Sequence, residues 1–543
     1  MPEVQVLLGL LVAVAVLALV AHRLNVPYPI VLVLGGLALA TIPGLPRVAL
    51  APGVVFLVFL PPLLFAGGWD TSIRDFKTNL RPIALLSVGL VLFTMAGVAA
   101  VAHAVVPGLS WPVAFVIGAI VSPTDAIAAT AIFTRLGVPH RIVAVLEGES
   151  LLNDATGLIA YRFAVAAVVT GGFSLWEAGW QFVVSGLGGL ALGLAAAWLL
   201  SQATRRLEDP VVEITLSFLL SYGVYLGAEQ LGVSGVLAVV AAGLYSGWRG
   251  PEDMSAVTRT QAMAVWQMAL FVLNGLVFIL IGLQLRTVLE SLGSRSPLFF
   301  LAAAAIIGLV VIVLRFVWVF PATYLPRLLS RRLRARDPYP SPRAVTVIAW
   351  TGMRGVVSLA AALSLPLTTQ SGAGFPNRDL VLYLTFAVIL LTLVGQGLTL
   401  PGLIKLLRLT GRDDGAQEEV EARFQSIDAA MRRLDELETE NGAGSPALDY
   451  MRHYYGKRRS HVATRFNRLD GEHGPEGHRH VDGADHLTDH REREDTFRRL
   501  QRELISTERA TLLTLRNRGE INDQTLRNIQ RDLDLEELRL VAS

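Results

Sequence analysis

The sequence contains no cysteine and few charged residues. Without cysteine, the chain can form neither a disulfide bond nor a thiolate metal site. Charged residues make up only 17% of the 543 residues, whereas apolar residues make up 52%, and the mean hydropathy is +0.50. A water-soluble protein of this length carries more charge, so the composition excludes the soluble globular class and predicts a membrane protein.

The sequence also has little excess charge, with a formal net charge of +2. Nucleic-acid binding is therefore not indicated, and membrane lipids are the expected surroundings. No basic residue precedes the first apolar segment, 4–20, and no small-residue cleavage pattern follows it before Arg23. We expect this segment to be an uncleaved first helix rather than a signal peptide.

Long apolar runs are present throughout the first three quarters of the chain. The runs 83–106, 178–200 and 297–326 each reach or exceed the roughly 20 residues that a helix needs to cross a bilayer. They are continuously apolar and lack the alternation of outer-membrane barrel strands. The sequence therefore predicts an all-α polytopic membrane protein.

Hydropathy divides the membrane domain, residues 1–410, into about 13 predicted spans. Their centres lie near residues 12, 36, 60, 94, 123, 158, 190, 221, 241, 273, 312, 354 and 393. Alternate loops carry most of the basic residues, including Arg74, Arg135, Arg205, Arg249 and the cluster that begins at Arg327. Because basic loops stay in the cytoplasm, this pattern predicts an outside N-terminus and a cytoplasmic C-terminus.

The composition changes at about residue 411 from apolar to charged. Residues 411–543 are predicted to form a cytosolic tail, with helical apolar spacing at 424–437 and 497–540. The segment 471–490 is rich in histidine, glycine and acidic residues. We interpret it as a solvated linker; metal binding and pH sensing are alternatives, because histidine titrates near neutrality.

Five charged residues fall inside predicted spans: Asp125, Glu149, Asp154, Arg315 and Arg354. Even on the most lenient scale, a charge at the bilayer centre costs about 2.5–3.5 kcal/mol, so such residues line a bundle interior or a wet cavity. They usually mark an ion or proton path, although a buried ion pair that only fixes helix packing is the competing interpretation. For Arg315 the two interpretations stay open at this point.

Asp125 follows a proline in the middle of a predicted span. Pro123 removes a backbone donor and frees a carbonyl of the preceding turn, so we expect the helix to break there. Transporters use such breaks to line an ion site with backbone carbonyls and helix ends. The neighbouring hydroxyls of Ser122 and Thr124 strengthen this interpretation.

The next span contains two pairs of polar residues with helical spacing. Glu149 and Asn153 lie four residues apart, as do Ser150 and Asp154, so the pairs line neighbouring strips of one helix. Oxygen ligands suit a hard monovalent cation such as sodium. Two close carboxylates also disfavour simultaneous ionisation, so protons can compete with the cation for the same oxygens.

A second predicted span is interrupted by glycines on both sides of an arginine. Gly352 and Gly355 flank Arg354, about seven spans after the first break, as expected for inverted repeats. The glycines alone would also suit close helix packing. We assign Arg354 to charge compensation at two crossed helix breaks.

Three motifs occur in the order found in the monovalent cation:proton antiporter family. They are Ser122-Pro123-Thr124-Asp125, Glu149-Ser150-Leu151-Leu152-Asn153-Asp154 and Gly352-Met353-Arg354-Gly355. Over about residues 1–410 the chain resembles the sodium/proton exchangers of this family. The resemblance implies an elevator-type homodimer in the bacterial inner membrane, with separate core and dimerisation subdomains and no cofactor besides the transported ions.

The resemblance also implies roles for individual residues. Asp154 would carry sodium and the proton in turn, and Asp125, Ser150 and Thr124 would complete the sodium site. Asn153 belongs to the same expected set of cation- and proton-binding residues. Its position beside Asp154 resembles the electroneutral class, which exchanges one cation for one proton. Glu149 would form a structural ion pair with Arg315.

Four other functions are alternatives to sodium/proton exchange. A potassium/proton antiporter would use the same residues, and a cation channel would use the acidic residues as a selectivity ring. A membrane enzyme is disfavoured because the sequence shows no metal cluster or nucleophile motif. Organic-substrate transport is disfavoured because the polar set inside the membrane is small.

Overall fold

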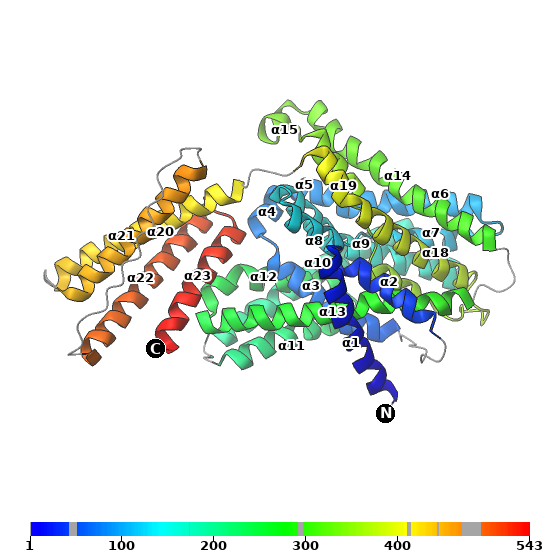
Figure 1. Cartoon of the computed structure of the whole chain (residues 1–543). Coiled ribbons are helices and arrows are strands. Elements are labelled where there is room, and N and C mark those ends of the chain that lie inside the picture. The colour runs from blue at the N-terminus through cyan, green and yellow to red at the C-terminus, as the bar shows by residue number, and fades with distance from the viewer. Residues whose placement is uncertain are drawn as a thin grey trace. The chain divides into compact units, whose positions relative to one another are not determined.

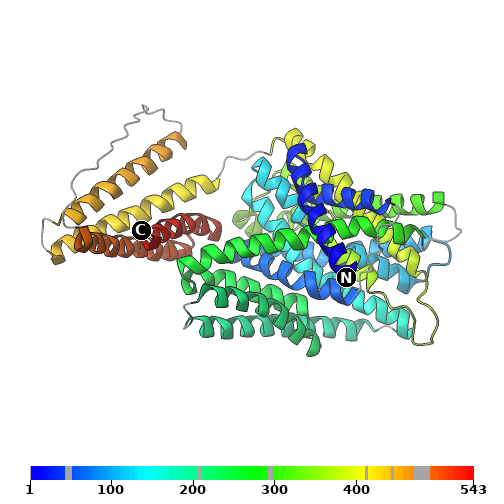
Figure 2. The same cartoon turned by 60° about the horizontal axis from the view of Figure 1, so that its bottom comes forward.

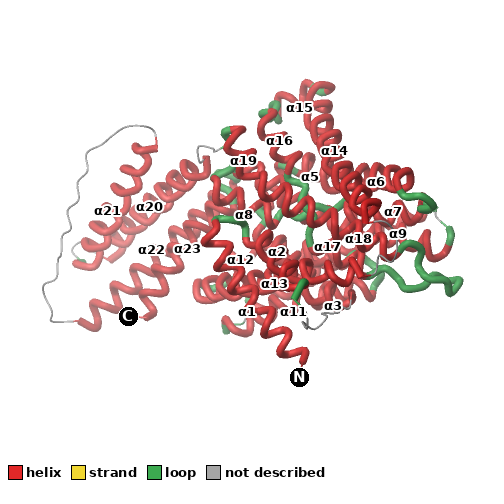
Figure 3. Tube along the Cα trace, turned by 45° about the vertical axis from the view of Figure 1, so that its right-hand side comes forward, coloured by secondary structure: helices red, strands yellow, loops and turns green. Residues whose placement is uncertain are grey.

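A computed structural model describes residues 2–42, 52–172, 174–205, 207, 209–290, 297–409, 414–441, 445–469 and 490–542. These residues are helical apart from short connections and one isolated bridge between Thr368 and Gly374 (Figure 1). In Figure 3 the helices are red, the loops are green, and no strand is drawn in the described part. The all-α prediction is therefore confirmed. The histidine-rich segment, except for His490 at the start of a helix, lies outside the described residues.

The chain divides into two compact units. Unit 1 comprises Met1–Thr71, Asp75–Asp253 and Met263–Gly411, and unit 2 comprises Ser72–Arg74, Met254–Ala262 and Arg412–Ser543. The first unit contains most of the apolar chain, and the second contains the charged C-terminal region.

Unit 1 is built from the apolar helices. In chain order the elements are α1 (Pro2–Leu24), α2 (Tyr28–Ala40), α3 (Pro52–Asp70), α4 (Ile73–Thr78), α5 (Leu80–Ala84), η1 (Leu85–Leu90), α6 (Val91–Val105), α7 (Trp111–Val121), α8 (Ile127–Leu136), α9 (His140–Thr170), α10 (Leu175–Thr204), α11 (Pro210–Gln230), α12 (Gly235–Asp253), α13 (Ala256–Glu290), α14 (Pro297–Leu329), α15 (Arg331–Arg336), α16 (Pro342–Trp350), α17 (Val356–Leu363), α18 (Arg378–Leu390), η2 (Leu391–Gln396) and α19 (Gly397–Leu407). The first turns of α13 belong to unit 2.

Eight helical stretches among the described residues are long and apolar enough to cross a membrane. They are Val4–Leu24, Leu80–Val105, His140–Thr170, Trp176–Thr204, Pro210–Gln230, Ala256–Gln284, Leu298–Leu329 and Arg378–Leu407. The other predicted centres fall on shorter helices or on breaks between two helices. The protein is thus a multi-pass membrane protein, and the count of 13 spans stays a prediction.

The helices of unit 1 pack in two groups. In one group, α12 packs against α3, α10 and α11; in the other, α7 packs against α6 and α9, and α14 packs against α6, α16 and α18. Glycines permit the closest approaches: a Cβ on Gly193 of α10 would lie 1.9 Å from the carbonyl oxygen of Ala238 of α12. Small residues at such positions let helix backbones come together, which compensates for the weak hydrophobic driving force between helices in lipid.

Unit 2 is built around four helices, drawn from yellow to dark red in Figure 2: α20 (Asp414–Asn441), α21 (Pro446–Leu469), α22 (His490–Arg518) and α23 (Asp523–Ala542). Helix α20 packs against the other three. Their buried leucine and isoleucine side chains form a core of their own. This packing explains the helical apolar spacing of the tail, because an amphipathic helix buries its apolar stripe against its neighbours.

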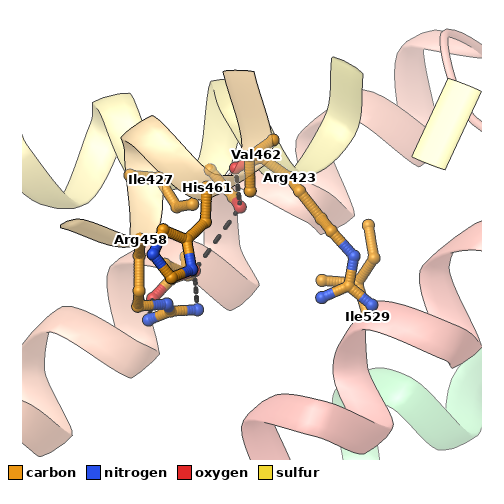
Figure 4. A pocket seen from close by; sticks show the side chains of 8 residues that line it. Arg423, Ile427, Arg458, His461, Val462 and Ile529 are labelled. Atoms are coloured by element: carbon orange, nitrogen blue, oxygen red, sulfur yellow. Dashed lines mark hydrogen bonds and ion pairs between the residues drawn. The ribbon is translucent and has the colours of Figure 1, made fainter. Parts of the chain in front are cut away.

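A cavity of about 180 Å³ lies among these four helices (Figure 4). Its lining residues are Arg423, Ser426, Ile427, Arg458, His461, Val462, Glu508 and Ile529. The buried Glu508 carboxylate accepts hydrogen bonds from the Tyr455 hydroxyl at 2.8 Å and from the Arg458 guanidinium at 3.0 Å. The cavity therefore borders an ion pair inside the tail.

Candidate functional site

The two interrupted helices of unit 1 meet at their breaks, in a region that we call the crossing. The first break, residues 122–126, separates α7 from α8, and the second, residues 351–355, separates α16 from α17. The backbone N–H of Asp125 donates to the carbonyl oxygen of Met353 at 2.7 Å. Two segments more than 200 residues apart thus share a backbone hydrogen bond, and the predicted pair of crossed interrupted helices is present.

Close backbone approaches explain two of the glycines around the crossing. A Cβ on Gly157 would lie 2.2 Å from Cγ of Pro123, so α9 packs directly against the first break. A Cβ on Gly355 would lie 1.9 Å from the Asp125 Oδ2 atom. Any larger residue at either position would displace the break, so the glycines are required by space.

Two buried arginines satisfy the carbonyl ends of the half-helices. Arg354 donates from Nε to the carbonyl oxygen of Val121, the last residue of α7, at 2.9 Å, and it also donates to the carbonyl of Gly352. Arg315 donates from Nε to the carbonyl oxygen of Ile348, near the end of α16, at 3.1 Å. A helix C-terminus carries partial negative charge, so each arginine stabilises one half-helix inside the membrane.

Glu149 forms an ion pair with Arg315, and both side chains are only 1% exposed. The Arg315 Nη2 atom donates to Glu149 Oε2 at 2.8 Å. The Thr124 hydroxyl donates to Glu149 Oε1 at 2.9 Å. The charge of Glu149 is therefore fully compensated, and the pair ties α9 and α14 to the first break.

The Asn153 amide holds the unwound chain in place. Its Nδ2 atom donates to the carbonyl oxygen of Thr124 at 2.9 Å and to the Thr124 hydroxyl at 2.8 Å. These bonds fix both Thr124 and the direction of the neighbouring Asp125. The amide nitrogen of Asn153 thus supports the backbone at the break, whereas its Oδ1 atom is buried without a hydrogen-bond partner among the described residues.

Asp125 lies at the beginning of α8. Its Oδ1 atom accepts the backbone N–H of Ile127 at 2.8 Å. The backbone N–H of Ala126 donates to the Ser150 hydroxyl at 3.3 Å, which brings Ser150 to the same turn. A helix N-terminus favours a negative charge, so this position gives the Asp125 carboxylate a fixed partner.

Asp154, which is partly buried like Asp125, differs from Glu149 and Asp125 in its partners. It lies on α9 four residues after Ser150, near enough to Asp125 for the two carboxylates to interact electrostatically. In the part of the chain that the structure describes, its carboxylate has neither a hydrogen-bond partner nor an ion-pair partner. A carboxylate at membrane depth without a partner is suited to exchange a cation and a proton.

The crossing therefore brings together all the residues that the sequence singled out. Asp125, Ser150 and Asp154 surround the beginning of α8, with Thr124 and Asn153 next to them and Glu149, Arg315 and Arg354 behind them as charge compensation. Carboxylate, hydroxyl and carbonyl oxygens are the ligands that a hard monovalent cation takes in place of water. The set contains no third acidic residue free to ligate, which favours a singly charged ion.

Sequence reasoning missed two contributions to this site. The carbonyl of Met353 accepts the Asp125 N–H, and the Thr392 hydroxyl accepts the Arg354 N–H at 3.2 Å. Neither could be recognised, because a backbone carbonyl has no sequence signature and a threonine in an apolar span is common. Only the glycines around Arg354 indicated that another chain segment comes close.

A multi-pass helical membrane protein with two crossed, interrupted helices beside acidic residues at membrane depth has the architecture of a secondary transporter. A family model described as "Sodium/hydrogen exchanger, transmembrane" matches residues 9–406. The chain therefore belongs to the sodium/hydrogen exchanger family, a family of transporters.

Individual relatives agree with this assignment. An uncharacterized Na+/H+ exchanger of Mycobacterium tuberculosis is 36% identical over 542 residues, which cover 99% of this chain and 96% of the relative. A sodium, potassium, lithium and rubidium/H+ antiporter of Bacillus pumilus is 37% identical over 387 residues, covering 69% of this chain and 57% of the relative. The structure of the sodium proton antiporter MjNhaP1 from Methanocaldococcus jannaschii has the same fold, with a TM-score of 0.58, 20% sequence identity, and coverage of 76% of this chain and 100% of that one.

Proposed function

We propose that this protein exchanges sodium or lithium for protons across the bacterial inner membrane, with Asp154 binding cation and proton in turn. The observation that carries the proposal is the contrast in partners among the three carboxylates at the crossing. Glu149 is paired with Arg315 and Asp125 caps α8, whereas Asp154 has no partner among the described residues. The same family membership supports antiport rather than a channel.

We propose that Asp154, Asp125, Ser150 and Thr124 supply the ligands of the sodium ion. The Thr124 hydroxyl donates its proton to Glu149 and accepts one hydrogen bond from Asn153, so one oxygen lone pair stays available to a cation. Asn153 keeps Thr124 and Asp125 in position through its two bonds to Thr124. Preorganised oxygens lower the cost of removing water from the ion.

Competition between protons and the cation for the same carboxylates couples cation transport to proton transport. With both carboxylates ionised and no cation present, the site holds two neighbouring negative charges in a medium of low dielectric constant, which is costly. We propose that only the protonated or cation-loaded site moves across the membrane, by an elevator motion of the crossing against the group that contains α3, α10, α11 and α12. One cation for one proton makes the exchange electroneutral.

The arrangement in the membrane is part of the proposal. The distribution of basic loops supports an outside N-terminus and a cytoplasmic tail. The exposed apolar side chains of α1 and α10, including Trp176 and Trp180, would contact lipid or a second copy in a homodimer. We also propose a membrane domain over residues 1–410 and a cytosolic tail over 411–543; the compact unit that contains Arg412–Ser543 supports this division, although it also includes Ser72–Arg74 and Met254–Ala262.

A potassium/proton antiporter is the second candidate. It is favoured by the printed name of the Bacillus pumilus relative, which includes sodium, potassium, lithium and rubidium. The same oxygens serve the larger ions if the site does not close tightly around the smaller ones. The two candidates differ only in which cation drives proton movement.

The experiment measures the collapse of a preset proton gradient in everted vesicles on adding sodium, lithium, potassium or choline. We expect sodium or lithium to collapse the gradient with the native protein and not with Asp154→Asn. The same substitution at the exposed Asp379, in the first turn of α18, is the matched control and should leave exchange intact.

Each other outcome has a defined meaning. Collapse by potassium alone would replace sodium by potassium, and no cation-dependent collapse between about pH 6 and 9 would reject antiport. Exchange at the normal rate by Asp154→Asn would reject Asp154 as the carrier. Setting the membrane potential to zero should leave the rate unchanged; a change in rate would contradict electroneutral exchange.

A further inference from the structure

Gln396 has a buried side-chain amide that no described part of the protein hydrogen-bonds. It is 1% exposed, and among the side-chain amides that the structure describes it alone has both its oxygen and its nitrogen buried without a hydrogen-bond partner. Buried polar groups in native proteins are nearly always hydrogen-bonded, so an exception needs an explanation. Ion binding is one of the functions for which such groups are kept.

Gln396 lies at the end of a π-helical turn that contacts the second break. The segment η2 interrupts the otherwise α-helical stretch Arg378–Leu407. Within η2, the Thr392 hydroxyl accepts the backbone N–H of Arg354. π-helical turns inside α-helices are rare and occur often at functional sites.

The neighbours of Gln396 show which side of the helix it occupies. Thr392 precedes it by four residues, and residues four apart share a side of a helix. Gly397 follows it directly, and a Cβ there would lie 3.8 Å from the sulfur of Met353. Gln396 therefore lies one turn after the residue that binds Arg354, next to a position close to Met353, whose carbonyl oxygen accepts the Asp125 N–H.

Two half-helices, α8 and α16, lie next to the helix that carries Gln396. Helix α19, which begins at the residue after Gln396, packs against α8 and α16. The Trp350 ring N–H, at the end of α16, donates to the Thr399 hydroxyl at 3.2 Å. Both interrupted helices are thus in contact with the helix that carries Gln396.

The chemistry of an amide suits a monovalent cation. Its carbonyl oxygen is a hard neutral ligand, and its NH₂ group donates to a water molecule that the cation retains. Because the amide is neutral, it adds no charge to the site and leaves the competition between cation and proton to the carboxylates. A neutral amide ligand of this kind can change how much more it costs to dehydrate a small cation than a large one.

We propose that Gln396 is a selectivity residue that binds the partly hydrated monovalent cation next to the crossing, as the ion moves between the aqueous phase and Asp154. This inference rests on the proposed cation/proton exchange. If the inference is correct, the amide of Gln396 contributes to cation binding but does not increase the stability of the protein. Replacing an unpaired buried amide with an apolar side chain of similar shape is expected to be neutral or stabilising, so the fold by itself does not require the amide.

The test uses Gln396→Met in the full-length protein, with Gln396→Asn as the variant that keeps the amide. The matched control is Thr385→Val, since Thr385 has a fully buried hydroxyl without a partner on the same helix, about 16 Å from Gln396. Cation-dependent collapse of the proton gradient gives the apparent KM and maximal rate for sodium, lithium and potassium. Thermal unfolding in sodium-free buffer gives the stability.

For Gln396→Met we expect an apparent KM for sodium and lithium about three- to tenfold higher than that of the native protein, with a smaller rise for potassium. The maximal rate should stay within about twofold of the native rate, and the Tm should be unchanged or higher. Gln396→Asn should keep part of the selectivity, and Thr385→Val should leave the KM unchanged. An unchanged KM or a lower Tm for Gln396→Met would overturn the inference, and an equal effect of Thr385→Val would remove its specificity. If the native protein itself shows no cation-dependent exchange, the proposed function fails instead.

Discussion

The crossing in unit 1 and the ion-pair cluster in unit 2 both bury carboxylates, but they treat them differently. In the tail, Glu508 is 1% exposed and accepts from Tyr455 and from both terminal nitrogens of Arg458. At the crossing, Glu149 is satisfied in the same way, whereas Asp154, on the same helix, has no partner among the described residues.

This difference separates structural charges from functional ones. Burial raises the pKa of Glu508, and the hydrogen bonds and the charge of Arg458 oppose that rise. A buried carboxylate that serves only the fold needs such donors, because an unpaired charge costs several kcal/mol. A carboxylate left without them is unfavourable for stability, and exchange of ions and protons explains why it is kept.

Neutralising one carboxylate in each region gives the largest expected contrast. Asp154→Asn should lower cation-dependent proton exchange at least about a hundredfold while leaving Tm unchanged or higher, since it removes an unpaired charge. Glu508→Gln should lower the stability of the tail by about 1–3 kcal/mol and change exchange less than twofold. Vesicle transport and hydrogen exchange of α22 measure the two effects. Equal loss of transport in both variants would break the comparison.

A steric change at the crossing should come next in effect. Gly355→Ala places a Cβ 1.9 Å from Asp125 Oδ2, so either Asp125 or the break must move and exchange should fall about tenfold or more. Gly402→Ala on α19 is the control, because nothing lies within 4 Å of the position of its Cβ. Vesicle assays compare the two at equal protein content. Normal exchange by Gly355→Ala would show that Asp125 need not hold its position.

The structural pair at the crossing should behave like the ion pair in the tail. Glu149→Ala leaves Arg315 buried without its partner and should cost about 3–5 kcal/mol of stability. The double variant Glu149→Ala with Arg315→Met should cost less than the sum of the single variants. Thermal unfolding of the purified protein measures this coupling. Strictly additive losses would contradict the pairing.

The smallest effect is expected at a partly exposed pair outside the membrane. The hydrogen bonds and charges of Arg141 and Arg327 outweigh burial and lower the pKa of Asp337 below 3.8. A lowered pKa stabilises the fold above about pH 4, and this contribution is lost as the pH falls through the lowered value. Asp337→Asn should therefore cost about 1 kcal/mol at neutral pH, because Arg141 is half exposed and the amide oxygen of the asparagine can still accept from the buried Arg327.

Unfolding of both proteins as a function of pH checks this prediction. The difference in stability between native protein and Asp337→Asn should be constant above about pH 4 and should narrow at lower pH. A difference that grows on acidification would show that the pKa of Asp337 is raised instead.

The sequence identified the site because its chemistry is rare in a membrane. Pro123, Asp125, Asp154 and Arg354 stand out against apolar surroundings, and no neighbour in space is needed to recognise them. Close packing is different: Gly157 and Gly402 look alike in the sequence, yet only Gly157 touches another segment. Likewise, nothing in the sequence distinguishes Gln396 from a glutamine with ordinary partners.

By itself, therefore, the sequence determined the all-α membrane class, the two helix breaks and the residues around them, because hydropathy, proline and intramembrane charge act locally along the chain. The tertiary structure decided the rest. It placed the Asp125 N–H against the Met353 carbonyl, Arg354 at the end of α7 and Arg315 at the end of α16. It also left Asp154, alone among these carboxylates, without a partner in the described residues. All of these features depend on contacts between distant segments. Such contacts are set by packing in three dimensions, which local sequence patterns do not encode.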